Sequence, residues 1–261
     1  MLTDGYPSLS GGTVPMPAPK IRVFKDIETF SRAAAAEFTA LVSRAAPGGK
    51  PFAAALSGGS TPKRFYELLA TPEFSSKIAW PRVHLFQVDE RCVPPNDAES
   101  NYRMMHETLL QHIDLPAANF HRMPAEQPDH EQAARHYENS LREALGVPPP
   151  GWPALDLVYL GLGGDGHTAS LFPGTVALDE HQLAVCANYV SQLKMFRLTL
   201  TFPVLNAAAK LIFLVSGAEK AEIARQVLRP SVTAIQFPAQ QIQPAHGAVS
   251  WYLDEAAARL L

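Results

Sequence analysis

The sequence has few cysteines, no long apolar run and no strong excess of charge. Its two cysteines, Cys92 and Cys186, are far apart and belong to no CxxC or Cys/His spacing, so neither a disulfide framework nor a structural zinc site is expected. No apolar stretch approaches the roughly 20 residues of a membrane helix, and the N-terminus lacks the basic start and apolar core of a signal peptide. These absences predict a cytoplasmic protein with no structural metal.

Neither sign of charge dominates the chain. The 22 Lys and Arg residues against 25 Asp and Glu residues leave a formal net charge of −3. This balance argues against a broad surface for nucleic acid or an anionic membrane, whereas a local basic pocket can still receive a small acidic substrate. We therefore expect a small-molecule partner and neither nucleic acid nor membrane.

The order of patterns along the 261 residues indicates one α/β domain. Residues 1–19 are rich in Pro, Gly, Ser and Thr and have too few large apolar side chains to offset the entropy of ordering, so we expect a flexible leader. From Ile21 onward, short β-like runs alternate with helical patterns, which predicts a mostly parallel sheet with crossover helices. Residues 20–261 are therefore interpreted as a single domain.

The predicted fold is Rossmann-like, with helices on both faces of the sheet and room for a small lid-like appendage. An Ala-rich helix is predicted over 28–46, and 116–128 is the least regular segment. Strands are predicted at 21–24, 52–56, 83–88, 155–160, 183–190, 197–202 and 211–215.

A histidine on a glycine-rich turn is the most informative local feature. The segment Gly161–Gly174 follows the apolar run 155–160, and open α/β sheets bind ligands just past such strand ends. Glycines let the backbone approach a bound group, and a histidine can move protons near neutral pH. This turn is predicted to be part of an active site, with His167 as its base.

The same turn contains a literal GxGxxG, which invites a dinucleotide-binding interpretation. Pro173 stops any following helix after little more than a turn, and no acidic residue closes a following strand about 20 residues on to hold a ribose. Both features argue against a nicotinamide or flavin enzyme.

A second glycine turn, Ser57–Pro62, ends a predicted strand and opens a helix. With Thr61 as N-cap and Pro62 at the first helical position, the helix start presents unpaired amides to an anion. The alternative is an ordinary strand-to-helix turn with a good cap. The spacing is not that of a P-loop, which argues against hydrolysis of a nucleoside triphosphate. Candidate phosphate-binding residues are Ser57, Gly58, Gly59, Ser60 and Thr61.

Two further clusters carry polar chemistry. After the third strand, Arg91 is suited to a phosphate, Asp89 to a sugar hydroxyl or a water, and Asn101 to capping or binding. The alternative there is a local Asp/Arg ion pair with an N-cap. Lys194 and Arg197 stand before or at the start of an alternating strand, where the alternative is simple solvation.

Together these blocks resemble the 6-phosphogluconolactonases of the glucosamine-6-phosphate isomerase/6-phosphogluconolactonase superfamily. The matching blocks are Ser57–Pro62, Asp89–Pro94 with 100–102, and Gly161–Gly174; weaker matches are 197–201, 216–220 and 251–257. Their order and spacing agree from about residue 20 to the end.

The resemblance implies hydrolysis of 6-phospho-D-glucono-1,5-lactone in the oxidative pentose phosphate pathway, without a metal or organic cofactor and with a functional link to glucose-6-phosphate dehydrogenase. His167 is expected to activate water, oriented by Asp165 or Asp89, with turn amides near 163–166 stabilising the oxyanion. The loop 57–61, Arg91 and either Arg197 or Lys194 are expected to hold the phosphate.

Two rivals stay open. An aminosugar-phosphate isomerase-deaminase shares such turns. Deaminases of that type, however, carry Asp-Glu-Tyr after the third strand and Asn-Glu-Pro after the histidine. This chain has Asp89-Glu90-Arg91 and Ser170-Leu-Phe-Pro173 instead. The second rival is a non-catalytic sugar-phosphate sensor, against which His167 argues. No GxSxG nucleophile elbow of an ordinary esterase is present.

Overall fold

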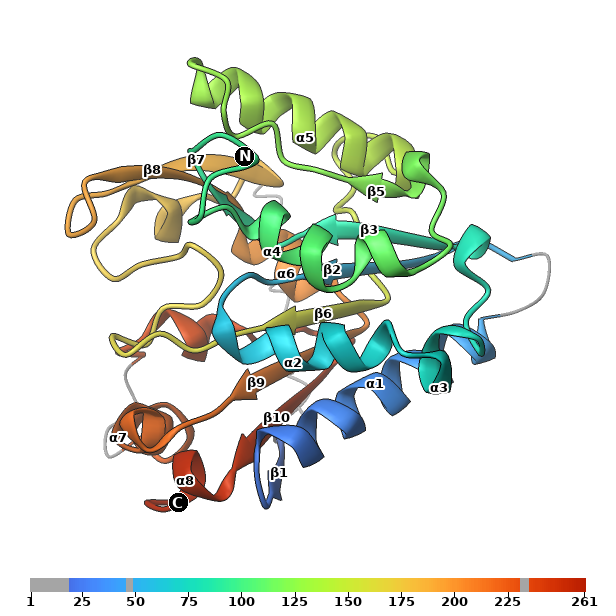
Figure 1. The fold of residues 1–261 in the computed structure, drawn as a ribbon. Helices are drawn as coiled ribbons and strands as arrows, with labels where there is room; N and C mark the ends of the chain where they lie inside the picture. Colours follow the sequence, from blue (N-terminus) through green and yellow to red (C-terminus); the bar gives the residue numbers. More distant parts are fainter. Residues whose placement is uncertain (1–18, 46–48, 231–234) are drawn as a thin grey trace, which may run out of the picture.

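The computed structural model describes residues 19–45, 49–230 and 235–261, and a parallel sheet of seven strands lies at its centre (Figure 1). The strand order is β1-β10-β9-β6-β2-β3-β5. The bounds are β1 Lys20–Phe24, β2 Phe52–Leu56, β3 Val83–Gln87, β5 Phe120–His121, β6 Leu157–Leu160, β9 Lys210–Val215 and β10 Ala248–Asp254. Of the predicted leader, all but Pro19 lies outside the described residues. That 20–261 form a single domain stays a prediction.

A second, antiparallel sheet of three strands has the order β4-β8-β7. Its members are β4 Asp89–Arg91, β7 Val185–Val190 and β8 Met195–Leu200. The chain enters it directly from β3, because only Val88 separates β3 from β4. The strands predicted at 183–190 and 197–202 therefore form, but they pair antiparallel with each other and lie outside the parallel sheet.

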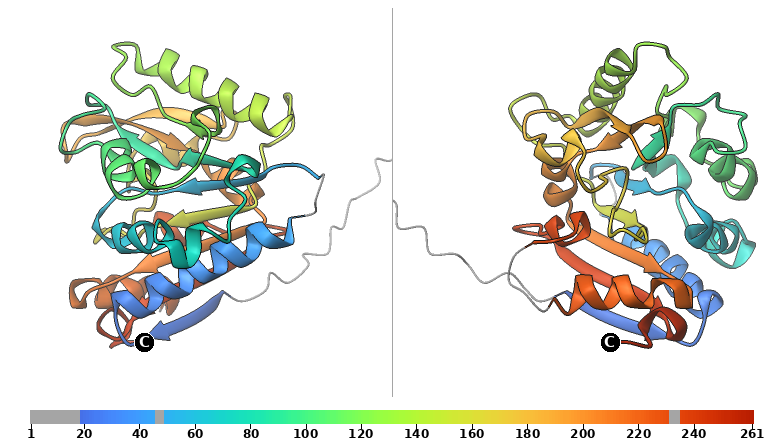
Figure 2. Two further views of the ribbon diagram at one scale, coloured as in Figure 1. Left: turned by 45° about the vertical axis from the view of Figure 1, so that its right-hand side comes forward. Right: turned by 90° about the vertical axis from the view of Figure 1, so that its left-hand side faces the viewer.

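Helices cover both faces of the parallel sheet (Figure 2). The α-helices are α1 Ile27–Arg44, α2 Ser60–Leu69, α3 Pro72–Ser75, α4 Asn101–Thr108, α5 His130–Leu145, α6 Phe202–Ala207, α7 Ala221–Leu228 and α8 Glu255–Ala258. Short 3-10 turns lie at Trp80–Arg82, Leu110–His112, Ala117–Asn119, Val176–Asp179, Ala218–Lys220 and Pro238–Gln241. The predicted α/β class, mostly parallel with helices on both faces, is confirmed.

Strand β2 shows why the sheet must be covered on both sides. Ala53 and Ala55 belong to one buried apolar cluster, while Ala54 and Leu56 belong to the other. Because successive strand residues point to opposite faces, a strand apolar at every position needs packing partners on both. The three small alanines of this interior strand leave room for the elements that cover it.

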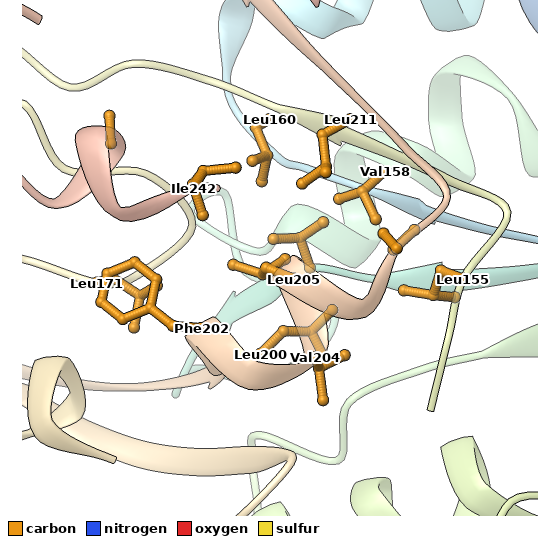
Figure 3. Packing of buried hydrophobic residues seen from close by; sticks show 14 of the residues in the cluster. Leu155, Val158, Leu160, Leu171, Leu200, Phe202, Val204, Leu205, Leu211 and Ile242 are labelled. Atoms are coloured by element: carbon orange, nitrogen blue, oxygen red, sulfur yellow. The ribbon is translucent and has the colours of Figure 1, made fainter. Parts of the chain in front are cut away.

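Helix α6 fills one of these two cores. Figure 3 shows Leu205 on the side of α6 that faces Val158, Leu160 and Leu211 of the parallel sheet. These four residues and Val204 belong to one buried cluster. Pro203 stands in the first turn of α6, where its missing N–H costs no helical hydrogen bond. Because α6 begins at Phe202 with Thr201 as its N-cap, the strand predicted at 197–202 ends two residues early, at Leu200.

The other predicted strands and the predicted helix agree with the structure to within two residues at each end. Three strands, β4, β5 and β10, were not predicted. No helix follows the glycine turn at 161–166. The predicted helix 28–46 runs from Ile27 to Arg44, and its start is fixed by Asp26, whose side chain accepts from the Thr29 amide at 2.8 Å. Among the described helices, none is long and apolar enough to cross a membrane.

Replacing the fully buried Leu205 with alanine is expected to lower the free energy of unfolding by about 2–5 kcal/mol, since the lost contacts leave a cavity in a packed core. Urea denaturation followed by circular dichroism measures this. Val176→Ala, at a side chain 78% exposed, is the control and should change stability by no more than about 0.5 kcal/mol. Equal midpoints for both variants would contradict the packing described for α6.

Candidate active site

A cavity of about 460 Å³ lies beyond the carboxyl ends of the parallel strands. The segments after β2, β6 and β9 reach it from the edge of the sheet seen at the left of Figure 1. Strands β4 and β8 of the antiparallel sheet contribute the opposite wall through Asp89, Arg91 and Arg197. The cavity therefore lies between the two sheets, at the edge where open α/β sheets bind ligands.

Most of the predicted site residues meet in this cavity. Lining it are Ser57, Gly58, Gly59, Ser60, Thr61, Asp89, Arg91, Asn101, His167 and Arg197. Asp165 does not line it but contacts His167. Lys194 is not brought to the cavity: it is exposed and lies in the turn between β7 and β8 with a φ of 49°. Between the two cations that the sequence left open, the structure favours Arg197.

His167 is held by a carboxylate and an aromatic ring. Its Nδ1 lies 2.5 Å from Asp165 Oδ1, and its ring stacks on Phe172 with centroids 3.8 Å apart. Burial alone would raise the pKa of Asp165, but the hydrogen bond and charge of His167 outweigh it and hold that pKa below its ordinary value. An ionised Asp165 makes Nδ1 the protonated nitrogen and leaves Nε2 as the basic one.

The close approach of Gly163 makes this pairing sterically feasible. A Cβ atom at Gly163 would lie 2.0 Å from His167 Nδ1, so no other residue fits there without moving the imidazole. The Gly163 amide donates to His167 O at 2.8 Å, and the Gly166 amide donates to Gly163 O at 3.1 Å. Two of the amides considered for an oxyanion are thus used inside the turn, while the Gly164 amide has no acceptor in the described part of the chain.

The start of α2 differs from the sequence prediction by two residues. The helix begins at Ser60 with Gly59 as N-cap, and no side chain caps it; Thr61 is therefore inside the first turn. Uncapped amides and the helix dipole together favour an anion at this point. Ser57 cannot donate its hydroxyl hydrogen to that anion, since Ser57 Oγ already donates to Tyr159 O.

Two arginines stand side by side on the opposite wall. Arg91 of β4 and Arg197 of β8 are direct partners in the antiparallel register, an arrangement that repels unless an anion lies between the charges. Burial foremost, and then the charge of Arg91, lower the pKa of Arg197, although Asp89 opposes this shift. The Nε atoms of both arginines are buried and have no hydrogen-bond partner among the described residues.

Asp89 and Asn101 form a hydrogen-bonded polar corner of the cavity. Asp89 Oδ2 accepts from Ser170 Oγ at 2.7 Å, and the backbone oxygen of Asp89 accepts from Asn101 Nδ2 at 2.9 Å. Asp165, not Asp89, is therefore the carboxylate that contacts His167. The Asn101 side-chain oxygen is buried without a donor among the described residues, so it is free to accept from a ligand.

Lys220 lines the cavity and was not selected from the sequence. It follows β9 in the segment Ser216–Lys220, whose start is fixed by Asp254: the Gly217 amide donates to Asp254 Oδ2 at 3.0 Å, and Ser216 Oγ donates to the same oxygen at 2.5 Å. The available signal was its position just past a strongly apolar strand. Among the described residues, no group of three or more His, Cys, Asp or Glu side chains is arranged to hold a metal ion.

Fold and site together define an α/β protein with a cavity lined by the start of a helix, two arginines and a histidine that is paired with a carboxylate. The sequence pattern of the family described as glucosamine-6-phosphate isomerases/6-phosphogluconolactonase matches residues 25–251. The chain belongs to this family, and the resemblance inferred from its motifs is confirmed.

Named relatives agree with this membership. The 6-phosphogluconolactonase of Synechocystis sp. is 43% identical over 204 residues, covering 78% of this chain and 82% of the relative. The structure of 6-phosphogluconolactonase from Trypanosoma cruzi is similar with a TM-score of 0.82 and 30% identity, covering 94% and 98% of the two chains. The human GDH/6PGL endoplasmic bifunctional protein is 38% identical over 209 residues, which are 78% of this chain but 25% of that protein.

Gly58→Ala is expected to weaken binding of inorganic phosphate by at least about tenfold, because an added Cβ would lie 1.7 Å from Asn101 Oδ1 and displace both loops of the anion site. Isothermal titration calorimetry measures the affinity. Gly164→Ala is the matched control, since nothing lies within 4 Å of its added Cβ, and it should bind phosphate like the unmodified protein. Unchanged affinity in Gly58→Ala would place the anion elsewhere.

Proposed function

We propose that the protein hydrolyses 6-phospho-D-glucono-1,5-lactone to 6-phospho-D-gluconate. The observation that carries the proposal is the His167–Asp165 pair at one side of a cavity whose other walls hold Arg91, Arg197 and Lys220. A substrate with a dianionic phosphate at one end and a reactive ester at the other fits such a division of charge. The named relatives support the same reaction.

In the proposed reaction His167 acts on water. With Nδ1–H donating to Asp165, the Nε2 lone pair accepts a proton as the water oxygen bonds to the lactone carbonyl carbon. The carbonyl oxygen becomes an oxyanion, for which the unoccupied Gly164 amide is our candidate donor. When the ring C–O bond breaks, the imidazolium returns its proton to the leaving ring oxygen, which becomes a hydroxyl group. The net change is the addition of one water across the ester.

At the other end, the phosphate is proposed to bind at the start of α2 and between the arginines. The backbone amides of 58–61, the hydroxyls of Ser60 and Thr61, and the guanidinium groups of Arg91 and Arg197 supply donors there. Binding this dianion holds the lactone against His167, so part of the acceleration comes from orientation. Asp89 and Asn101 are assigned to hydroxyl groups of the sugar.

Partner and location complete the proposal. Glucose-6-phosphate dehydrogenase supplies the lactone chemically, and the bifunctional human relative supports this functional link. We assign the protein to the cytoplasm, which agrees with its two unpaired cysteines. A non-catalytic sensor would not need the His167–Asp165 contact, and aminosugar deamination is the control reaction in the tests below.

His167→Gln is expected to lower kcat by about 10² to 10⁴-fold while leaving KM nearly unchanged, because the substitution removes the base but not the phosphate-binding residues. The lactone is generated in situ with glucose-6-phosphate dehydrogenase and its disappearance is followed with the spontaneous rate subtracted. The matched control is His181→Gln at an exposed position.

Full activity in His167→Gln would remove the proposed base. No activity above the blank in the unmodified protein would reject lactone hydrolysis, and release of ammonia from glucosamine 6-phosphate in the same preparation would favour the deaminase.

Arg197→Gln is expected to raise KM for the lactone by about tenfold or more with a small effect on kcat, since it removes a partly buried charge facing the proposed phosphate site but leaves His167 in place. Initial rates at varied lactone concentration measure both constants. Lys194→Gln, three residues away in the exposed turn, should stay within about twofold of the unmodified protein. The reverse ranking would restore Lys194 as the phosphate ligand.

A further inference from the structure

The Glu90 carboxylate is almost completely buried, with 2% of the residue exposed. It lies between two residues of the cavity wall, Asp89 and Arg91, yet it does not line the cavity. No Lys, Arg or His in the described part of the chain forms an ion pair with it. A buried carboxylate without a counter-charge is costly unless hydrogen bonds replace its water.

Five donors surround this carboxylate. Glu90 Oε1 accepts from the backbone amides of Arg91 at 2.8 Å and Asn101 at 2.7 Å. Glu90 Oε2 accepts from the Tyr102 amide at 2.7 Å, Gln87 Nε2 at 2.9 Å and Ser100 Oγ at 3.2 Å. The start of α4 and the end of β4 are therefore joined through one side chain.

Capping of α4 alone does not account for this arrangement. Ser100 already serves as N-cap, because its side chain accepts from the Arg103 amide. The additional effect of Glu90 is to hold the Arg91 and Asn101 amides on a single oxygen atom, although these residues are ten positions apart in the chain. Both residues line the cavity.

The side chains of Arg91 and Asn101 need such support. Arg91 Nε and Asn101 Oδ1 are buried without hydrogen-bond partners in the described part of the chain. The other ends of these side chains are hydrogen-bonded, Arg91 Nη1 to Glu99 O and Asn101 Nδ2 to Asp89 O. The unsatisfied atoms still cost free energy, so each side chain is only partly held by its own contacts in the unliganded protein. A rigid backbone on each side keeps them directed at the cavity in the absence of ligand, which lowers the ordering cost of binding.

We propose that Glu90 is a positioning residue, whose carboxylate fixes the spacing between Arg91 and Asn101 and so preorganises the cavity for its anionic substrate. It touches neither substrate nor reacting atoms. The inference rests on the proposed function for the identity of the substrate, but the geometry requires only that an anion bind at Arg91.

Glu90→Gln tests this with almost no change of volume. The substitution turns one oxygen into an NH₂ group, which then faces either the amides of Arg91 and Asn101 or the amide of Tyr102 and Gln87 Nε2. Gln87 cannot simply flip to accept, because its Oε1 already accepts from the Met123 amide at 2.8 Å. Donor faces donor in both orientations, so the β4–α4 connection must shift.

The expected result is a split between binding and turnover. Glu90→Gln should raise KM for the lactone by about tenfold and weaken the binding of inorganic phosphate by a similar factor. Its kcat should stay within about threefold, because His167 and Asp165 have no hydrogen bond to Glu90 or to the residues that Glu90 holds. Initial rates and isothermal titration calorimetry with inorganic phosphate measure these quantities.

Two comparisons separate positioning from loss of stability. Glu138→Gln makes the same chemical change outside the cavity lining. The Glu138 side chain is 12% exposed and accepts hydrogen bonds from the Ala184 amide at 2.8 Å and from Arg142. This variant should lower the unfolding midpoint without raising KM. In the double variant Glu90→Gln with Arg91→Ala, the loss of phosphate affinity should be less than the sum of the two single losses, since Glu90 acts partly through Arg91.

A folded Glu90→Gln protein with unchanged KM and unchanged phosphate affinity would overturn the proposal, as would strictly additive losses in the double variant. If the unmodified protein binds phosphate but does not hydrolyse the lactone, the proposed function fails while the phosphate measurement still decides the role of Glu90. If Glu90→Gln does not fold, Ser100→Ala removes one donor to the carboxylate and should produce a smaller rise in KM; no rise would count against the proposal.

Discussion

At Val88 the chain leaves the parallel sheet and enters the antiparallel one. The Val88 amide donates to Leu56 O at the end of β2, and the Val88 carbonyl accepts from the Leu200 amide at the end of β8, both at 2.9 Å. One residue thus bonds to both sheets and fixes their separation where the cavity lies. Two of the cavity walls begin at this junction, because Ser57 follows the β2 end and Asp89 follows Val88.

The cavity walls carry polar groups that folding alone does not satisfy. Two arginines pair across β4 and β8, the first turn of α2 is uncapped, and one oxygen of Asn101 is buried without a donor. Each of these features opposes stability in the unliganded protein and favours an anionic ligand. The large apolar cores on both faces of the parallel sheet stabilise the fold enough for it to tolerate these local costs. Such a cost, concentrated in one place, is typical of a binding site.

The sequence predicted the fold class and most of the cavity lining, because apolar runs mark strands and polar turns after them mark one edge of the sheet. Periodicity could not assign β7 and β8 to a second sheet, since pairing depends on contacts between distant segments. The same limit explains Lys194 and Arg197. They are three residues apart, and only the hairpin register shows that one is in a turn and the other opposite Arg91. Likewise, only the structure shows that Asp165, and not Asp89, contacts His167.

Binding and proton transfer are assigned to different parts of the structure. The arginines belong to the antiparallel sheet, while His167 and Asp165 belong to the turn after β6 of the parallel sheet. The proposed substrate would contact both parts, and the backbone hydrogen bonds of Val88 hold the two sheets that carry them in a fixed relation. Such a fixed relation between the two parts helps to orient a bound substrate. The buried carboxylate of Glu90 fits this logic, because it adds hydrogen bonds to the backbone of the binding wall at the point where β4 is only three residues long.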